Sequence, residues 1–187
     1  MKRSYQIRTV ALSALFLALA YVLPFVTGQI PQFGAMLCPM HIPVLLCGFF
    51  CGWLSGLAVG AIAPLLRSLT LGVPLLFPSA ICMAFELATY GAVAGLLYRL
   101  LPSKKPYVYV SLLGSMLAGR LIWGCAMAIC LGIGGNPFTF SAFLAGAFTG
   151  SIPGIILQII IVPVTVMLPP VVRLMRQSTD KHTRQTQ

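Results

Sequence analysis

The sequence predicts an all-α integral membrane protein, a bundle of six transmembrane helices with both termini in the cytoplasm. Of its 187 residues, 59% are apolar and only 7% are charged. Apolar runs of about 20 residues match the thickness of the hydrocarbon core of a bilayer, and such runs recur along the whole chain between short polar breaks. They are continuous and rich in Leu, Ala and Gly, whereas the strands of a membrane β-barrel alternate in polarity over roughly 10 residues.

The first predicted span covers residues 8–26, which follow Lys2 and Arg3. A basic start and the Ala-Leu-Ala at 18–20 also resemble a signal peptide with its cleavage site. We reject that interpretation, because the apolar stretch is long for a signal peptide and a first span can direct insertion without being cleaved. The other predicted spans cover residues 39–52, 55–71, 78–99, 108–132 and 152–172.

The apolar run at 39–66 is too long for one comfortable crossing, and the charges indicate that it crosses twice. Short loops rich in Lys and Arg stay in the cytoplasm. A single crossing would put Lys104 and Lys105 on the opposite side from the basic N-terminus, whereas two crossings with an uncharged turn near 53–55 put them on the same side. This topology accounts for most of the +10 formal charge without nucleic-acid binding. The basic residues expected inside are Lys2, Arg3, Arg8, Arg99, Lys104, Lys105, Arg173, Arg176, Lys181 and Arg184.

Glycines recur at every fourth position through the same run, at Gly48, Gly52, Gly56 and Gly60. Small residues at this spacing permit close approach of helix backbones. A turn in the middle divides the stripe into two short contact faces, and the tolerance of glycine for positive φ favours a tight hairpin there.

The segment at 138–151 is predicted to form a short interfacial or re-entrant helix before Pro153 opens the last span. We expect residues 1–176 to form a single six-helix domain that binds substrate. Residues 177–187 are polar and are expected to form a disordered cytoplasmic tail.

Four ionisable side chains are expected at or near membrane depth: His41, Arg67, Glu86 and Arg120. Charges there are costly, usually face the bundle interior and mark function. Glu86 is the only acid besides Asp180, so one arginine can pair with it and the other has no acidic partner. Two interpretations stay open. Either a Glu–Arg pair fixes the register of two helices while the other arginine donates to carbonyls at a helix end, or one of the arginines binds a ligand. For Arg120 we favour a bidentate contact with a carboxylate-bearing ligand.

The remaining candidates are polar or aromatic residues within or beside the spans. His41 precedes Ile-Pro at a helix start, where an interfacial cap is the commoner use. Asn136 before Pro137 favours a turn, and Gln158 favours a bond to a neighbouring helix. Tyr90 and Trp123 lie inside spans, where they fill the core or stack on a flat ligand. With the ionisable residues they form a predicted small-molecule pocket that opens to the outside.

Six cysteines are present without a CxxC motif or a Cys/His cluster, so we expect neither a metal site nor thiol redox chemistry. The sequence has neither a pair of acidic residues nor a nucleophile with a matching base, so it does not indicate a catalytic site. The first span carries Ala11, Ala14 and Ala18 on one face, and the default use of such small residues is packing within the chain. A docking surface for a second membrane subunit is the alternative.

The chain resembles the S components of energy-coupling factor (ECF) transporters, the small membrane subunits that capture the substrate of vitamin importers. The resemblance covers about residues 6–173 and is strongest in "CPMHIPVLLCGFFCGWLSGLAVGAIAPLLRSLTLGVPLLFPSAICMAFELATYGAVAGLLYR" and "IPGIILQIIIVPV". Ala14 and Ala18 match an alanine-xxx-alanine motif that docks on the coupling subunit in that family. Trp53 stands where the family often has Gly-Pro.

The resemblance implies a mechanism and partners. A vitamin would be captured from outside under the first external loop, "TGQIPQFGAMLCP", and the S component would then dock on a transmembrane coupling subunit and topple in the bilayer. Two ATPase subunits would drive the cycle, and the absence of a GxxxxGK[ST] motif here agrees with ATP hydrolysis by partners. No cofactor is expected. The implied location is the bacterial plasma membrane.

The excess of arginine favours a small anionic vitamin or precursor such as pantothenate, followed by riboflavin and folate-like compounds. Neutral ligands also stay open. A membrane enzyme is disfavoured, because one intramembrane acid and one histidine match no catalytic motif. The main alternative is a structural membrane protein like the cell-shape factor MreD, which is also small and six-helical and would bind no soluble ligand.

Overall fold

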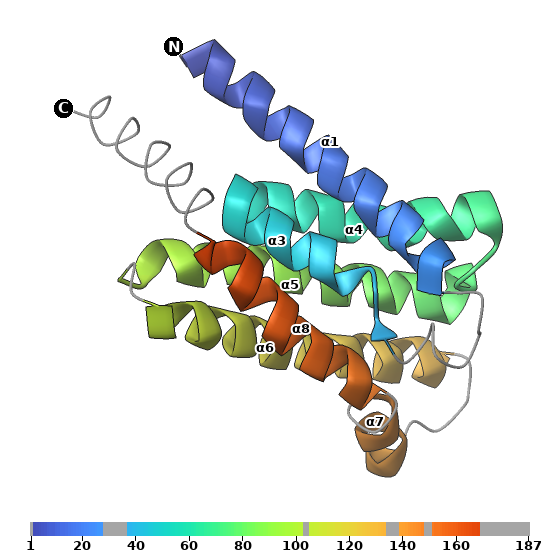
Figure 1. Cartoon of the computed structure of the whole chain (residues 1–187). Coiled ribbons are helices and arrows are strands. Elements are labelled where there is room, and N and C mark those ends of the chain that lie inside the picture. The colour runs from blue at the N-terminus through green and yellow to red at the C-terminus, as the bar shows by residue number, and fades with distance from the viewer. Residues whose placement is uncertain (1, 28–36, 103–104, 134–138, 148–150, 169–187) are drawn as a thin grey trace.

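The protein is all-α, as predicted. The computed structural model describes residues 2–27, 37–102, 105–133, 139–147 and 151–168 (Figure 1). A short irregular turn, η1 (Leu76–Ala80), leads into α5. The α-helices within the described residues are α1 (Lys2–Thr27), α3 (His41–Cys51), α4 (Trp53–Leu71), α5 (Ile81–Leu100), α6 (Lys105–Ile133), α7 (Phe140–Ala147) and α8 (Ile152–Met167).

Four helical stretches are long and apolar enough to cross a membrane, and the third combines η1 with α5: Gln6–Phe25, Trp53–Leu71, Leu76–Leu100 and Lys105–Gly132. Two shorter apolar helices, α3 and α8, occupy the other predicted spans. The helix count in the described residues is seven because α7 is separate, and α7 corresponds to the predicted short helix. The protein is therefore a multi-pass membrane protein, and the number of crossings stays a prediction.

The predicted boundaries differ most at the two ends. α1 begins at Lys2 because no Gly or Pro interrupts the basic residues before the apolar run. α8 begins at Ile152, as predicted, and is described to Met167. The predicted polar tail and residues 169–172 lie outside the described residues.

The chain reverses at Gly52, between α3 and α4. Gly52 has φ +89°, a conformation that side-chain-bearing residues rarely adopt. The reversal is tight, since the Cα of Gly48 lies 2.8 Å from the position that a Cβ on Gly56 would occupy. The predicted break between two helices is confirmed and lies one residue before Trp53.

Glycines then bring three helices into backbone contact. A Cβ added to either Gly48 or Gly56 would meet the carbonyl oxygen of Gly91 on α5. A Cβ on Gly95 would lie 2.7 Å from the carbonyl oxygen of Gly48, so the contact continues for another turn. Such contacts are typical of helix packing in membranes, where small residues let backbones approach. They fix α3, α4 and α5 relative to one another.

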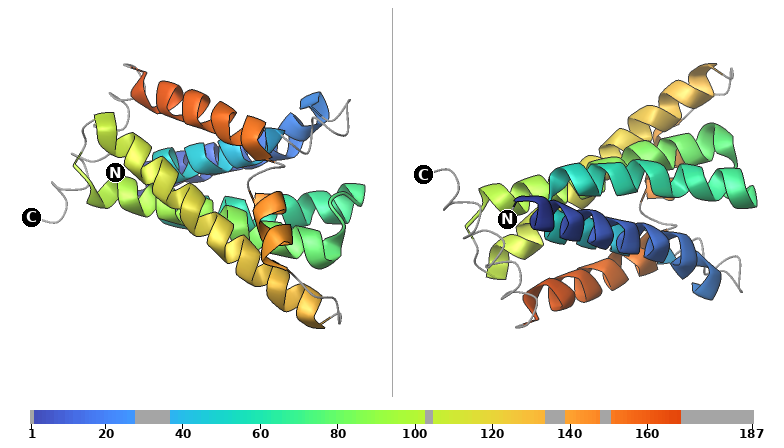
Figure 2. Two further views of the ribbon diagram at one scale, coloured as in Figure 1. Left: turned by 90° about the horizontal axis from the view of Figure 1, so that it is seen from below. Right: turned by 90° about the horizontal axis from the view of Figure 1, so that it is seen from above.

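α3 lies in the interior, packed by α1, α4, α5 and α8. One apolar cluster joins α3 to α5, α6 and α8, and a second joins α3 to α1, α4 and α5. Figure 2 shows α7 lying across α6 at the end of the bundle where α8 begins. This arrangement places the start of α3, the first turns of α5 and the middle of α6 near one another.

Candidate functional site

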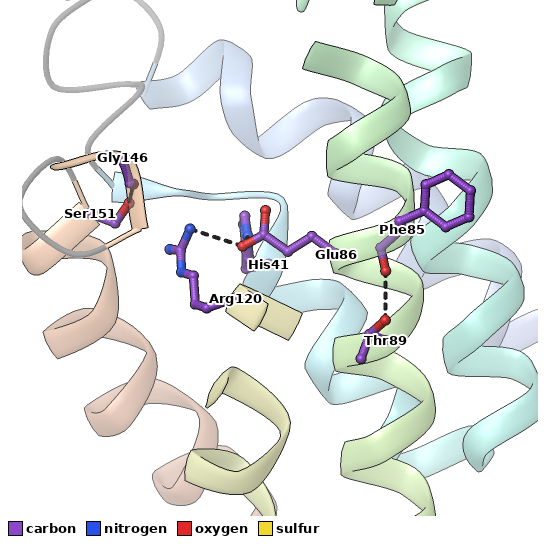
Figure 3. A network of polar contacts seen from close by, with 7 residues as sticks. All are labelled: His41, Phe85, Glu86, Thr89, Arg120, Gly146 and Ser151. Atoms are coloured by element: carbon purple, nitrogen blue, oxygen red, sulfur yellow. Dashed lines mark hydrogen bonds and ion pairs between the residues drawn. The ribbon is translucent and has the colours of Figure 1, made fainter. Parts of the chain in front are cut away.

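Three ionisable side chains from three helices meet in the interior. His41 is the first residue of α3, Glu86 lies in the second turn of α5, and Arg120 lies near the middle of α6. Their exposed fractions are 2%, 2% and 6%. Figure 3 shows the side chains of Glu86 and Arg120 extending toward each other, with His41 beside the carboxylate. Phe85 points away on the opposite side of α5.

Arg120 is the arginine that pairs with Glu86. Its Nη1 lies 2.9 Å from Oε1 of Glu86, and Nε2 of His41 lies 3.5 Å from the same oxygen. The expectation of a deep, unpaired Arg120 is therefore wrong. The physical reason is that α5 and α6 pack side by side, which brings the two opposite charges together in a medium of low dielectric constant.

Arg67 has different partners. Its Nε donates a hydrogen bond to the carbonyl of Val73 (3.2 Å) and its Nη1 donates to the carbonyl of Tyr21 (3.3 Å). The guanidinium carbon also lies 5.1 Å from the ring centroid of Phe25. None of these partners belongs to the group around Glu86. Arg67 thus joins α1 to the end of α4, with backbone carbonyls as the acceptors predicted for the spare arginine.

Tyr90 completes the group, which we call the polar cluster: His41, Glu86, Tyr90 and Arg120. Tyr90 is fully buried one turn beyond Glu86, and its ring meets the His41 ring edge to face at 5.1 Å. The hydroxyl has no partner with hydrogen-bond geometry, yet it lies close enough to Glu86 and Arg120 to interact with their charges.

Gln158 is buried on α8, the helix that packs against α3 and α6. Neither its amide nitrogen nor its amide oxygen has a hydrogen-bond partner within the described residues. The predicted bond to a neighbouring helix is therefore not found there.

Unpaired buried polar atoms are concentrated at these positions. Within the described chain, nine buried side-chain nitrogen or oxygen atoms lack a hydrogen-bond partner, and all except Oγ of Ser68 belong to the polar cluster or Gln158. They include Nε and Nη2 of Arg120 and Nδ1 of His41. Each such atom costs about 1–3 kcal/mol, and folded proteins contain few of them. This concentration is typical of a site that a polar ligand completes.

Two further residues reach the cluster that sequence reasoning missed. The thiol of Cys38, just before α3, interacts with Arg120 and Glu86 and contacts the hydroxyl of Ser151. Ser151, just before α8, also donates a hydrogen bond to the carbonyl of Gly146 (3.4 Å) (Figure 3). Cys38 has φ +46°, an uncommon conformation for a residue with a side chain, and the sequence carries no signal for it. Cys38, just before α3, and Ser151, just before α8, thus meet beside the cluster.

Trp123 and Asn136 are the remaining predicted pocket residues. Trp123 stacks on Phe143 of α7, with ring centroids 6.3 Å apart and planes inclined by 29°. A Cβ on Gly146 would lie 2.7 Å from Cη2 of Trp123, so the indole ring also packs closely on the backbone of α7. Trp123 therefore attaches α7 to α6. Asn136 lies outside the described residues.

A model of the family described as "ECF transporter, substrate-specific component" matches residues 8–166. This chain belongs to that family. Searches of curated proteins and of solved structures found no match.

As an S component, the protein is a substrate-binding subunit of a transporter, and the family it belongs to is a family of transporter components, not of enzymes. Such subunits bind a small molecule and dock with the components of an ECF module. The family match supports the transporter interpretation over a structural cell-shape protein. Within the described residues of this S component, no three His, Cys, Asp or Glu side chains lie together as metal ligands would.

The S component presents the alanine face of α1 outward. Ala11, Ala14 and Ala18 are exposed, whereas Phe16 and Ala20 on the opposite face are buried against the bundle. Packing within the chain, the default interpretation for these alanines, does not occur in the described structure. The face is accessible to another membrane subunit or to lipid.

Proposed function

We propose that this S component captures a vitamin or vitamin precursor from outside a bacterial cell and binds it at the polar cluster. The observation that supports this most directly is the concentration of unpaired buried polar atoms on Arg120, His41, Tyr90 and Gln158. A ligand that satisfied them would recover the free energy lost on burying those groups, and this is a general source of specificity in buried sites. Arg67, whose donors are already used, is left out of the proposed site.

The proposed topology has six crossing helices with both termini in the bacterial cytoplasm. α7, with eight residues, is the shortest of the described α-helices and corresponds to the predicted interfacial or re-entrant helix, so it is not counted as a crossing. In this topology the connection between α6 and α8, which contains α7, lies on the outer side. The distribution of Lys and Arg among the loops supports this orientation.

Delivery of the substrate is proposed to require docking of α1 on a transmembrane coupling subunit, with two ATPase subunits as the source of energy. The outward alanine face supports this step, because small side chains let another helix approach closely without a cost in side-chain ordering. The face lies on α1, whereas the cluster is built from α3, α5 and α6, so binding and docking use separate surfaces.

For the substrate we favour a small anionic vitamin such as pantothenate over riboflavin or folate-like compounds. Nε and Nη2 of Arg120 lie along one edge of the guanidinium and have no partner within the described residues. Two parallel N–H donors of this kind match the two oxygens of a carboxylate.

The test is mass spectrometry of the small molecules that copurify with the detergent-solubilised protein, followed by thermal-shift measurements with a panel of vitamins. We expect one vitamin at near-stoichiometric occupancy, and the same vitamin should raise the melting temperature. A protein that is empty and that no vitamin stabilises would contradict substrate capture.

Docking has its own test. Replacing Ala14 by Trp puts a large side chain at the centre of the alanine face, so copurification with the coupling and ATPase subunits and vitamin uptake should be lost, while ligand affinity should stay within about twofold of the wild type. Ala128→Trp, on an exposed face of α6, is the matched control and should assemble normally. Normal assembly of the Ala14 variant would exclude this face as the docking surface.

A further inference from the structure

Glu86 already pairs with Arg120, the residue expected to bind the ligand. The proposed function does not say what Glu86 itself contributes to ligand binding. Nη1 of Arg120 lies 2.9 Å from Oε1 of Glu86. Nε and Nη2 of the same guanidinium are buried and without a hydrogen-bond partner in the described chain. The ion pair therefore uses Nη1 of Arg120. Within the described residues no acceptor with hydrogen-bond geometry meets its Nε/Nη2 edge, although the Cys38 thiol lies close to the guanidinium.

The unused edge of Arg120 favours an anionic group on the ligand. Two donors on one rigid edge bind a carboxylate with two parallel hydrogen bonds, which are stronger than hydrogen bonds between neutral groups. A neutral acceptor would satisfy the two donors less well. The ligand group beside Arg120 is therefore expected to carry a negative charge.

Glu86 imposes a second requirement. Its Oε1 is close to Arg120 and His41 in distance, but no donor meets it with hydrogen-bond geometry. A buried carboxylate oxygen of this kind is stabilised by an aligned donor. A hydroxyl or amide N–H on the ligand can supply that donor, whereas a second ligand carboxylate would be repelled.

The charges around the cluster disfavour more than one negative group on the ligand. Glu86 and Arg120 cancel each other, and within the described residues Arg120 is the only buried Lys or Arg. One added carboxylate leaves a net charge of −1, which the two donors of the Nε/Nη2 edge offset by hydrogen bonding, whereas a second carboxylate would add a further charge with no buried cation to bind it.

We infer that Glu86 is a specificity-determining residue, and that the site takes a monocarboxylate whose hydroxyl or amide N–H donates to Glu86 while its carboxylate binds the Nε/Nη2 edge of Arg120. This inference rests on the proposed function. Dicarboxylates, cations and neutral compounds are rejected. Gln158 on α8, whose amide nitrogen and oxygen have no hydrogen-bond partner among the described residues, is available for an amide group of the same ligand.

The test compares carboxylates with uncharged isosteres on the wild-type protein, so that it does not depend on the folding of any variant. The probes are pantothenate with panthenol and biotin with biotinamide, together with riboflavin, thiamine and folate. We expect one of the two monocarboxylates to bind, and its isostere to bind about 100-fold more weakly or worse. Titration calorimetry and thermal shift give the affinities.

The variant Glu86→Gln then separates two roles for the carboxylate. If Glu86 accepts a hydrogen bond from the ligand, the variant should bind the monocarboxylate about tenfold more weakly. If Glu86 only neutralises Arg120, the variant should bind it more tightly, and this result, like an unchanged affinity, would overturn the inference. Arg67→Gln is the matched control and should leave affinity unchanged, since the partners of Arg67 lie on α1 and after α4.

The outcomes distinguish the inference from the proposed function. Binding of riboflavin, thiamine or folate with high affinity would leave substrate capture intact and overturn the inference about ligand charge. Equal affinity for an acid and its uncharged isostere would do the same. Failure of every probe, together with an empty purified protein, would overturn substrate capture itself and the inference with it.

Discussion

Arg67 and Arg120 occupy two contrasting regions of one bundle. Both lie in apolar helices, yet Arg67 donates to backbone carbonyls at the surface between α1 and α4, and Arg120 meets an acid in the interior. Arg67 is half-buried, and Arg120 is buried with two nitrogens left without a partner in the described chain. The depth of an arginine in the membrane therefore does not by itself identify it as a ligand-binding residue. A binding role is indicated when neighbouring residues leave some of its N–H donors without an acceptor.

The largest effect that would test this contrast is expected from Arg120→Ala. Removing the charged edge should weaken vitamin binding by about 100-fold or more, because both charge-assisted hydrogen bonds are lost. Glu86 loses its buried cation, so the melting temperature should fall. The apolar packing of α5 against α6 remains, so the protein should still purify as a folded monodisperse species. Affinity by titration calorimetry and folding by circular dichroism provide the two measurements. An unchanged affinity would remove Arg120 from the site.

A smaller loss of affinity is expected from Gln158→Leu. This variant tests whether Gln158, a buried uncharged residue of the bundle interior, belongs to the binding site. Binding should weaken about tenfold through loss of a hydrogen bond. The empty protein should melt at a higher temperature than the wild type, since two unpaired buried polar atoms are removed. Weaker binding without this gain in stability would show that the Gln158 amide is already paired in the empty protein.

The smallest effect is expected from Arg67→Ala. The free energy of unfolding should fall by about 1–2 kcal/mol, because two hydrogen bonds and a contact with the Phe25 ring are lost at a partly exposed position. Vitamin affinity should stay within about twofold of the wild type. A large loss of affinity with unchanged thermal stability would reverse the roles assigned to the two arginines.

Much of this organisation is predictable from sequence because it depends on local patterns. Apolar runs and their breaks predict the helices, and the glycine repeat with an uncharged centre predicts the hairpin at Gly52. His41, Glu86 and Arg120 stand out in the sequence because placing an ionisable side chain at membrane depth costs free energy. Four predicted residues, these three and Tyr90, do meet in the structure.

What sequence could not decide depends on packing between helices. The choice between Arg67 and Arg120 as the partner of Glu86 depends on which helix faces α5 at that depth. Cys38 and Ser151 reach the cluster only because the starts of α3 and α8 converge. Trp123 contacts α7 because that short helix lies across α6, and no pattern around Trp123 indicates this.

The glycine contacts described above also divide the bundle into parts that can move and parts that cannot. α3, α4 and α5 touch through backbone atoms, which have no rotamers to change, so these helices can separate only by losing the contact. α6 meets α5 less closely, because a Cβ on Gly119 would lie 3.0 Å from the ring of Tyr90 and 3.2 Å from the carbonyl oxygen of Glu86, so its position can adjust more as side chains turn. The contact between Glu86 and Arg120 is thus a joint between a stiff frame and an adjustable helix. We therefore expect a molecule bound at that joint to shift α6 more readily than the frame on which α1 rests.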